Sequence, residues 1–220
     1  MQAKTLDHIA FWVSDRHRIT AFAERHLGMH AIVTDDAFTL IGSDARRGKL
    51  TLFDADGPRD PAAFKNVGLR VADLAAARAA LPAGTPEVFD IGEGINIALV
   101  EAETDVDYDL DHVALWSASP TTTAEEYARY GFEPAGPARV EVGGAFVELH
   151  EGSAAVTERP LLNHVAVLVE SADEVIADAA DLAIEVESVV DAANTYAAFL
   201  VGPERVRIEY VEHKPTFSLT

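Results

Sequence analysis

Three histidines stand at equivalent places in strongly apolar stretches of the chain. Each stretch has the composition of a buried β-strand: D-H-I-A-F-W-V-S-D from Asp7, D-H-V-A-L-W-S-A-S from Asp111 and N-H-V-A-V-L-V-E-S from Asn163. A buried imidazole without a polar partner costs about 1–3 kcal/mol, so His8, His112 and His164 each need a partner. That partner is either a hydrogen-bonding group in the core or a metal ion bound by a ring nitrogen.

A fourth stretch, K-N-V-G-L-R-V-A-D from Lys65, repeats the pattern with Asn66 in place of the histidine. Each stretch precedes a helix-like segment, predicted at 15–27, 74–81, 121–131 and 171–182. Two or three short strand candidates follow each helix, separated by glycine, proline and aspartate. We therefore predict an α+β fold of four βαβββ units, paired into two domains, each an incomplete barrel-like mixed sheet around a cleft.

The stretch E-A-E-T-D-V-D-Y-D at 101–109 is acidic and rich in turn-forming residues. Two units lie on either side of it. The predicted division is therefore an N-terminal pair of units at 1–104 and a C-terminal pair at 105–220.

Composition narrows the classes of function. The chain has 220 residues, 49% of them hydrophobic, which indicates a globular protein with a substantial core. Its net charge of −20 argues against a nucleic-acid partner, and the absence of cysteine excludes thiolate metal sites and disulfides. The sequence has no apolar run long enough for a membrane span and no signal-peptide pattern at its start, so we expect a cytoplasmic protein.

Four such units, with a histidine on the first strand of a unit, resemble the vicinal oxygen chelate superfamily. That superfamily includes glyoxalase I, bleomycin-resistance proteins and type I extradiol ring-cleaving dioxygenases. The resemblance extends from about Lys4 to Val211 and is strongest to the extradiol enzymes, which also have four units. It implies a metal site in the C-terminal pair, made by His112, His164 and the Glu209 of F-L-V-G-P-E-R-V-R-I-E-Y.

Two imidazoles and one carboxylate on one face of a metal leave three coordination positions open. This arrangement suits Fe(II), which can hold a catechol-like aromatic substrate together with O₂. The donor types also leave Mn(II), Ni(II) and Zn(II) open.

Within this interpretation, the N-terminal pair of units has a degenerate site. Its equivalent positions hold His8, Leu52, Asn66 and Ala98. The C-terminal pair holds His112, Glu148, His164 and Glu209. Since unpaired buried charge is costly, a unit that binds no metal should lose such residues. The contrast predicts one metal, in the C-terminal half.

The resemblance also implies roles for residues around the metal. His150 corresponds to a histidine that acts as general acid and base, while Glu148 is the alternative, as a fourth ligand. Phe199 stands where the family usually has tyrosine, and Val190 where some members have histidine. Asn194 matches an asparagine of the family, and Trp116 is a candidate for the floor of the cleft. Tyr196 and Tyr210 should face away from Glu209.

The leading hypothesis is a metal-dependent extradiol dioxygenase of aromatic catabolism, with His150 as catalytic residue and Phe199, Asn194 and Trp116 as substrate-binding residues. Two alternatives stay open. One is a glyoxalase I-like lyase or isomerase with four protein ligands, and the other is a metal-free small-molecule-binding protein. The expected partners are a small aromatic molecule and O₂, with neither membrane nor nucleic acid, and a homo-oligomer is left open.

Overall fold

The computed structural model describes residues 1–154 and 157–220, and they form four consecutive units. The first unit contains β1 (Ala3–Val13), α1 (Arg16–His26), β2 (His30–Thr34), β3 (Phe38–Gly42) and β4 (Lys49–Asp54). The second contains β5 (Phe64–Val71), α2 (Leu74–Ala79), β6 (Val88–Asp90) and β7 (Asn96–Glu101). It therefore has one strand fewer than the others.

The third unit contains β8 (Asp109–Ser117), α3 (Pro120–Tyr127), a short 3₁₀ turn (Ala128–Tyr130), β9 (Glu133–Gly136), β10 (Arg139–Val142) and β11 (Ala145–Glu151). The fourth contains β12 (Leu162–Val169), α4 (Ala172–Asp181), β13 (Val186–Asp191), β14 (Thr195–Val201), a 3₁₀ turn (Pro203–Arg205) and β15 (Arg207–His213). All four predicted helices are present. The predicted α+β fold of repeated units around mixed sheets is confirmed.

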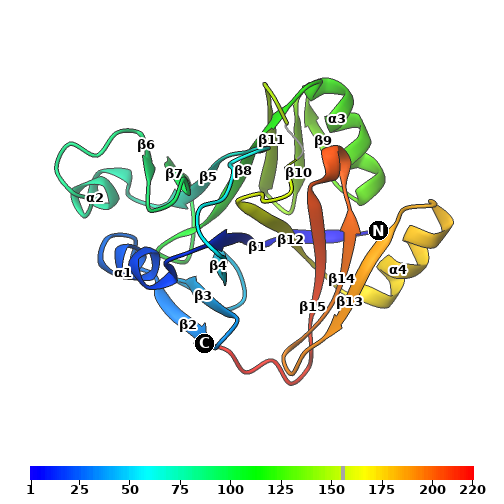
Figure 1. The fold of residues 1–220 in the computed structure, drawn as a ribbon, viewed down its shortest axis with the longest axis horizontal. Helices are drawn as coiled ribbons and strands as arrows, with labels where there is room; N and C mark the ends of the chain where they lie inside the picture. The colour runs from blue at the N-terminus through cyan, green and yellow to red at the C-terminus, as the bar shows by residue number, and fades with distance from the viewer. Residues whose placement is uncertain (155–156) are drawn as a thin grey trace.

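The strands form two mixed sheets (Figure 1). The eight-stranded sheet has the order β13-β14-β15-β12-β1-β4-β3-β2, and the seven-stranded sheet has the order β6-β7-β5-β8-β11-β10-β9. In each sheet the two central strands are antiparallel, β1 with β12 and β5 with β8. Each central strand also pairs in parallel with the last strand of its own unit.

This topology corrects the predicted pairing of units. The eight-stranded sheet joins the first unit to the fourth, and the seven-stranded sheet joins the second to the third. The predicted boundary at 104/105 lies in the connection from β7 to β8, two strands of the same sheet. The four units carry the same strand pattern, so the pattern did not specify which unit pairs with which.

Side-chain alternation along the central strands separates the core from a concave face. On β1, Ile9, Phe11 and Val13 are fully buried in a core that includes residues of both sheets. The Phe11 ring meets the Phe64 ring of β5 edge-to-face, with centroids 5.0 Å apart. His8, Ala10 and Trp12 consequently point to the opposite face of the sheet, where the candidate site lies.

Candidate metal centre

Three side chains converge on the concave face of the eight-stranded sheet: His8 of β1, His164 of β12 and Glu209 of β15. Strand register explains the convergence. His8 lies opposite Ala166 across the antiparallel pair, and Glu209 lies beside Ala166 across the parallel pair. The three residues therefore surround one point at the centre of the sheet.

The facing atoms form a nearly equilateral triangle. His8 Nε2 and His164 Nε2 are 3.0 Å apart, and Glu209 Oε2 lies 3.1 Å from the first and 2.8 Å from the second. For metal–ligand bonds of about 2.1 Å, the edge of an octahedral face is about 3.0 Å and a tetrahedral edge is about 3.4 Å. The three atoms thus fit one face of an octahedral metal ion and leave the opposite face open.

Each histidine is held from behind by its preceding residue. His8 Nδ1 lies 2.7 Å from Asp7 Oδ1, and His164 Nδ1 lies 2.9 Å from Asn163 Oδ1. An Nδ1–H that donates to an oxygen leaves Nε2 free to bind a metal, which is how metal-ligating histidines are usually oriented. The sequence pairs D-H and N-H therefore set the ring orientation in this site.

A cationic side chain donates to each of these orienting residues, the buried Lys49 to Asp7 and the partly exposed Arg207 to Asn163. Lys49 Nζ donates to Asp7 Oδ2 at 3.0 Å, and Arg207 Nη1 donates to Asn163 Oδ1 at 2.8 Å. Lys49 stands beside His8 in the register of β1 with β4, and it also donates to the Ala45 carbonyl oxygen at 2.8 Å. With Lys49 and Asp7 both almost fully buried, the pair must remain intact, because either charge alone would be costly in this position.

The triad favours one positive and one negative charge when no metal is bound. Burial alone would lower the pKa of His8, but the carboxylates of Glu209 and Asp7 outweigh it and raise the pKa to about 9. Burial would raise the pKa of Glu209, yet the two imidazoles hold it well below its usual range. Burial lowers the pKa of His164, although Glu209 opposes this. His164 and Glu209 are therefore already in the protonation states that metal coordination requires.

A fourth position on this face belongs to Thr51 of β4. Thr51 lies beside Ala10 just as Glu209 lies beside Ala166, two residues beyond the histidine of its own unit. Its side chain is buried, and its hydroxyl oxygen has no hydrogen-bond partner among the described residues. The predicted occupant was Leu52, but Leu52 packs into the core on the other face of β4. The predicted register of β4 was therefore wrong by one residue.

Aromatic rings border the triad. The ring centroids of Phe199 and Phe53 lie 5.2 Å and 6.1 Å from that of His164, both edge-to-face. Phe199 thus lies beside the triad, as expected of a residue paired with Glu209 between β14 and β15. The Arg207 guanidinium lies over the Phe199 ring at 4.7 Å, and Arg59 lies over the Trp12 ring at 5.4 Å.

The structure does not bring His112 to His164 and Glu209. His112 lies on β8 in the seven-stranded sheet, where its Nε2 is 3.3 Å from the Asn66 side-chain nitrogen and its Nδ1 is 2.8 Å from Asp111. The predicted ligand set is therefore corrected at one member, with His8 in place of His112. The error follows from the pairing of units, because the first unit, not the third, faces the fourth.

Glu148, His150 and Trp116 belong to the concave face of the same seven-stranded sheet. Glu148 lies beside Ala114, and His150 lies beside Trp116. His150 Nε2 is 3.8 Å from Glu148 Oε2, and the rings of His150 and Trp116 are 6.2 Å apart. These three residues thus accompany His112 rather than the triad, and the general acid–base role predicted for His150 has no geometric basis at His164.

Asn194 lies at the β13–β14 turn and binds the C-terminal segment rather than the triad. Its side-chain oxygen accepts from the backbone nitrogen of Ser218 at 3.1 Å. Tyr210 is in the core with its hydroxyl donating to the Tyr130 carbonyl oxygen, and the Tyr196 hydroxyl donates to Asp173. Both tyrosines face away from Glu209, as predicted.

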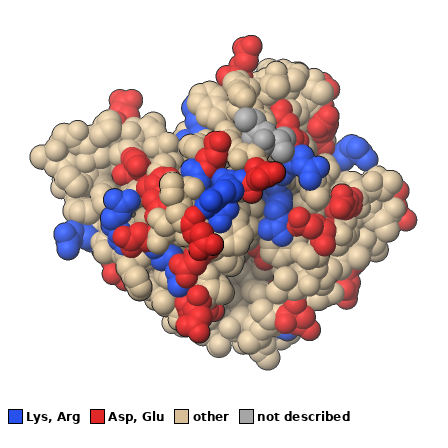
Figure 2. All heavy atoms as spheres, viewed as in Figure 1, with Lys and Arg blue, Asp and Glu red and all other residues tan. Residues whose placement is uncertain are grey.

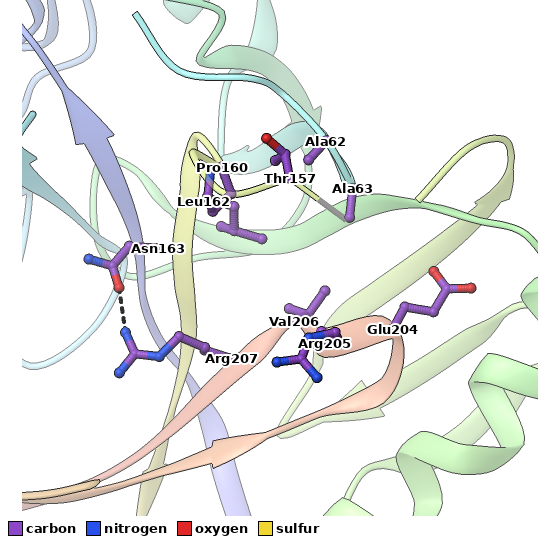
Figure 3. Close-up of a pocket in the computed structure, with 10 residues that line it drawn as sticks. All are labelled: Ala62, Ala63, Thr157, Pro160, Leu162, Asn163, Glu204, Arg205, Val206 and Arg207. Atoms are coloured by element: carbon purple, nitrogen blue, oxygen red, sulfur yellow. Dashed lines mark hydrogen bonds between the residues drawn. The ribbon is translucent and has the colours of Figure 1, made fainter. Parts of the chain in front are cut away.

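A cavity of about 130 Å³ lies next to the residues that orient His164 (Figure 3). Asn163 and Arg207 line it and are joined by the hydrogen bond drawn there, together with Leu162, Pro160 and Arg205. The triad itself does not line the cavity. A molecule held there would contact the partners of His164 rather than the metal-facing nitrogens.

Charge is unevenly distributed on the protein surface. Figure 2 shows basic side chains gathered near the middle of one face, with acidic side chains around them. None of the helices in the described part of the chain is long and apolar enough to cross a membrane.

The residues missed by sequence reasoning are His8 and Thr51. A signal for His8 was present, because D-H-I-A-F-W from Asp7 matches D-H-V-A-L-W from Asp111 at four of six positions. The two stretches differ in which unit they face across the central strand pair, and only the assembled sheet specifies that. Thr51 carried no local signal beyond its alternation with Leu50 and Leu52.

No protein-family model and no curated protein matches this sequence. Among solved structures, a "putative dioxygenase" from Bacillus subtilis matches with a TM-score of 0.81 at 17% identity, over 98% of this chain and 87% of that one. Glyoxalase I from Zea mays matches with a TM-score of 0.72 at 14% identity, over 96% and 92%. The cppA protein from Streptococcus pneumoniae matches with a TM-score of 0.63 at 12% identity, over 96% and 98%.

At such identities the similarity shows the fold alone. The match extends over nearly the whole length of the chain and of its structural neighbours. This chain therefore shares its fold with glyoxalase I from Zea mays and builds it from two mixed sheets.

Proposed function

We propose that this protein is a metal-dependent ring-cleaving dioxygenase of the extradiol type, with His8, His164 and Glu209 as its metal ligands. The triangle of edges 3.0, 3.1 and 2.8 Å between the three facing atoms supports the proposal best. Two imidazoles and one carboxylate on one octahedral face are the ligand set of non-haem Fe(II) oxygenases. The fold of the "putative dioxygenase" from Bacillus subtilis is consistent with this assignment.

When bound, a divalent ion such as Fe(II) supplies positive charge that favours deprotonation of a catechol, together with open positions for both catechol oxygens and for O₂. The side chains supply orientation. Asp7 and Asn163 fix the two imidazoles, and the anionic Glu209 offers the third ligand atom.

The surroundings of the triad suit a flat aromatic substrate. Phe53 and Phe199 flank His164, and Phe199 forms a small apolar cluster with Ala197 and Val211 that is separate from the main core. Aromatic rings prefer offset or edge-to-face contacts with such neighbours, each worth about 0.5–1.5 kcal/mol beyond burial. Phe199 offers no hydrogen bond, so we propose that it positions the substrate by packing alone.

A second candidate is a glyoxalase I-like lyase or isomerase, favoured by the fold match to the Zea mays enzyme. In that reading the metal has four protein ligands, and Thr51 at the fourth position is the residue that argues against it. The third reading, a metal-free binding protein, leaves the buried triad and its anchored partners unexplained.

One experiment separates the three readings. The protein is purified without chelators for elemental analysis, then loaded with Fe(II) under nitrogen and assayed for O₂ consumption with a panel of catechols. We expect one metal per chain and catechol-dependent O₂ uptake with a coloured ring-opened product. Stoichiometric metal without O₂ uptake would favour the lyase, and a protein that binds no metal would favour the binding protein. His112→Ala serves as the matched control and should behave like the wild type.

A further inference from the structure

Thr51 stands where the symmetry of the sheet predicts a fourth ligand. The first and fourth units meet across β1 and β12, and this pairing makes His8 equivalent to His164. On the parallel partner strands, Thr51 beside Ala10 is equivalent to Glu209 beside Ala166. The concave face therefore has four symmetry-related places, three filled by metal-ligating types and one by a hydroxyl.

Thr51 belongs to the face of β4 that carries the triad's neighbours. Phe53, two residues further along β4 and on the same face, brings its ring to 6.1 Å from the His164 ring. Leu50 and Leu52, which alternate with Thr51, are fully buried in the core on the other face. Thr51 therefore lies on the same face of the sheet as His8, His164 and Glu209.

The Thr51 hydroxyl is also buried and lacks a partner. Thr51 is 4% exposed, and its oxygen makes no hydrogen bond to any described residue. A buried hydroxyl is costly without a hydrogen bond, so an acceptor oxygen of a bound ligand would be stabilised at this position.

We propose that Thr51 contacts the incoming ligand and sets the ligand count at three. Its hydroxyl donates a hydrogen bond to the anionic oxygen of a vicinal diol, or to a water, that enters the open side of the triad. Because threonine is not a carboxylate, the protein leaves that side free for a two-oxygen ligand. This inference rests on the metal site proposed above and names the vicinal-diol class of ligand for it.

The first test uses Zn(II)-loaded protein, which carries out no O₂ chemistry, and 4-nitrocatechol as the probe. Binding is followed by the change in the probe's absorption spectrum, and Zn(II) affinity is measured separately by competition with a chelator. Thr51→Val keeps the shape but removes the hydroxyl, and we expect 4-nitrocatechol to bind about three- to tenfold more weakly, as for one lost hydrogen bond. Thr51→Ser restores the hydroxyl and should return binding to within about twofold of wild type.

The outcomes are distinct. Equal probe affinity in wild type and Thr51→Val, with Zn(II) bound equally, overturns the role of Thr51 and leaves the metal site intact. A wild-type protein that takes up no Zn(II) overturns both the metal site and this inference.

The second test supplies the missing ligand. Thr51→Glu places a carboxylate at the position equivalent to Glu209, so we expect Zn(II) affinity to rise by about tenfold or more and 4-nitrocatechol binding to be lost. Co(II)-substituted protein provides an independent readout, since its visible spectrum changes with the ligand set. A Thr51→Glu protein that folds, judged by its thermal unfolding midpoint, but binds Co(II) and probe as wild type does would contradict the proposal. Should it not fold, the Val and Ser variants decide.

Discussion

The concave faces of the two sheets carry related residues at equivalent places, yet they differ in what those residues form. The eight-stranded sheet has His8, Thr51, His164 and Glu209. The seven-stranded sheet has His112, Glu148, Asn66 and Ala98. Among the described residues, only the first set brings three metal-ligating atoms within 4.8 Å of one another.

The two faces differ most clearly at one position on a central strand, which holds His164 on β12 but Asn66 on β5. In the eight-stranded sheet, each central strand offers an imidazole, and the two Nε2 atoms meet at 3.0 Å. In the seven-stranded sheet, Asn66 replaces one imidazole. The His112 ring lies over Gly68, so close that a β-carbon there would be 2.2 Å from the ring. A repeated histidine motif therefore makes a site only where two units complement each other across the central pair.

The residues behind the histidines differ as well. The side chains of Asp7 and Lys49 are 2% and 3% exposed, whereas those of Asp111 and its partner Arg70 are 12% and 19% exposed. Both pairs orient an imidazole through Nδ1, but only the first is sealed from water. The eight-stranded sheet thus orients its histidine through the more deeply buried charge pair.

The largest contrast should appear on removal of a ligand. His164→Ala removes one of three ligand atoms, so metal affinity should fall by more than about 100-fold, beyond the usual effect of a residue that only supports a ligand. His112→Ala in the other sheet should leave it unchanged. Metal content after dialysis measures both. If His112→Ala lost its metal while His164→Ala kept a full equivalent, the metal site would have to be assigned to the seven-stranded sheet instead.

The second-largest effect should come from breaking the buried charge pair of Asp7 and Lys49. Asp7→Ala leaves Lys49 buried without its carboxylate, so the free energy of unfolding should fall by about 3–5 kcal/mol. Asp111→Ala leaves Arg70 without its carboxylate, but Arg70 is more exposed and water can solvate it. The free energy of unfolding should therefore fall by clearly less. Urea denaturation of metal-free protein measures both. Equal losses from the two variants would show that the burial difference has no energetic consequence.

Metal uptake should depend on pH through His8. Its pKa is raised to about 9 in the metal-free protein, so below that pH a metal must displace a proton from it. Apparent affinity should therefore rise about tenfold per pH unit from pH 7 towards 9. Chelator competition at several pH values measures the slope. His8→Gln binds metal more weakly, and its slope should be lost, which assigns the proton to this residue.

The smallest expected effect is the creation of a weak second metal site in the seven-stranded sheet. Asn66→His together with Gly68→Ala would give the seven-stranded sheet two imidazoles and Glu148 at the places of the triad. We expect a second metal equivalent, bound more weakly than the first because Asp111 and Arg70 are more exposed. Titration with Zn(II) counts the sites. Asn66→His alone should bind the second Zn(II) more weakly than the double variant, because Gly68 leaves room for the His112 ring to pack against β5.

Much of this protein was predictable from local pattern. The four repeated strands, the helices after them and the inward-facing position of each histidine follow from periodicity and turn residues, which act over a few neighbouring positions. His164 and Glu209 were implied by the family resemblance, and the implication holds for this pair because both residues lie in one unit, where β12 and β15 pair in parallel.

Only the tertiary structure determined which of His8 and His112 joins His164 and Glu209. Both sit in the same D-H motif, so no local property separates them, and their difference lies in which unit each faces. In the folded chain the second and third units pair in the seven-stranded sheet, and the first and fourth units pair in the eight-stranded sheet. The sequence by itself determined the ligands that each strand can offer. The assembly of strands far apart in the chain decided which of them meet, because the contacts that select the partner form only in the folded core.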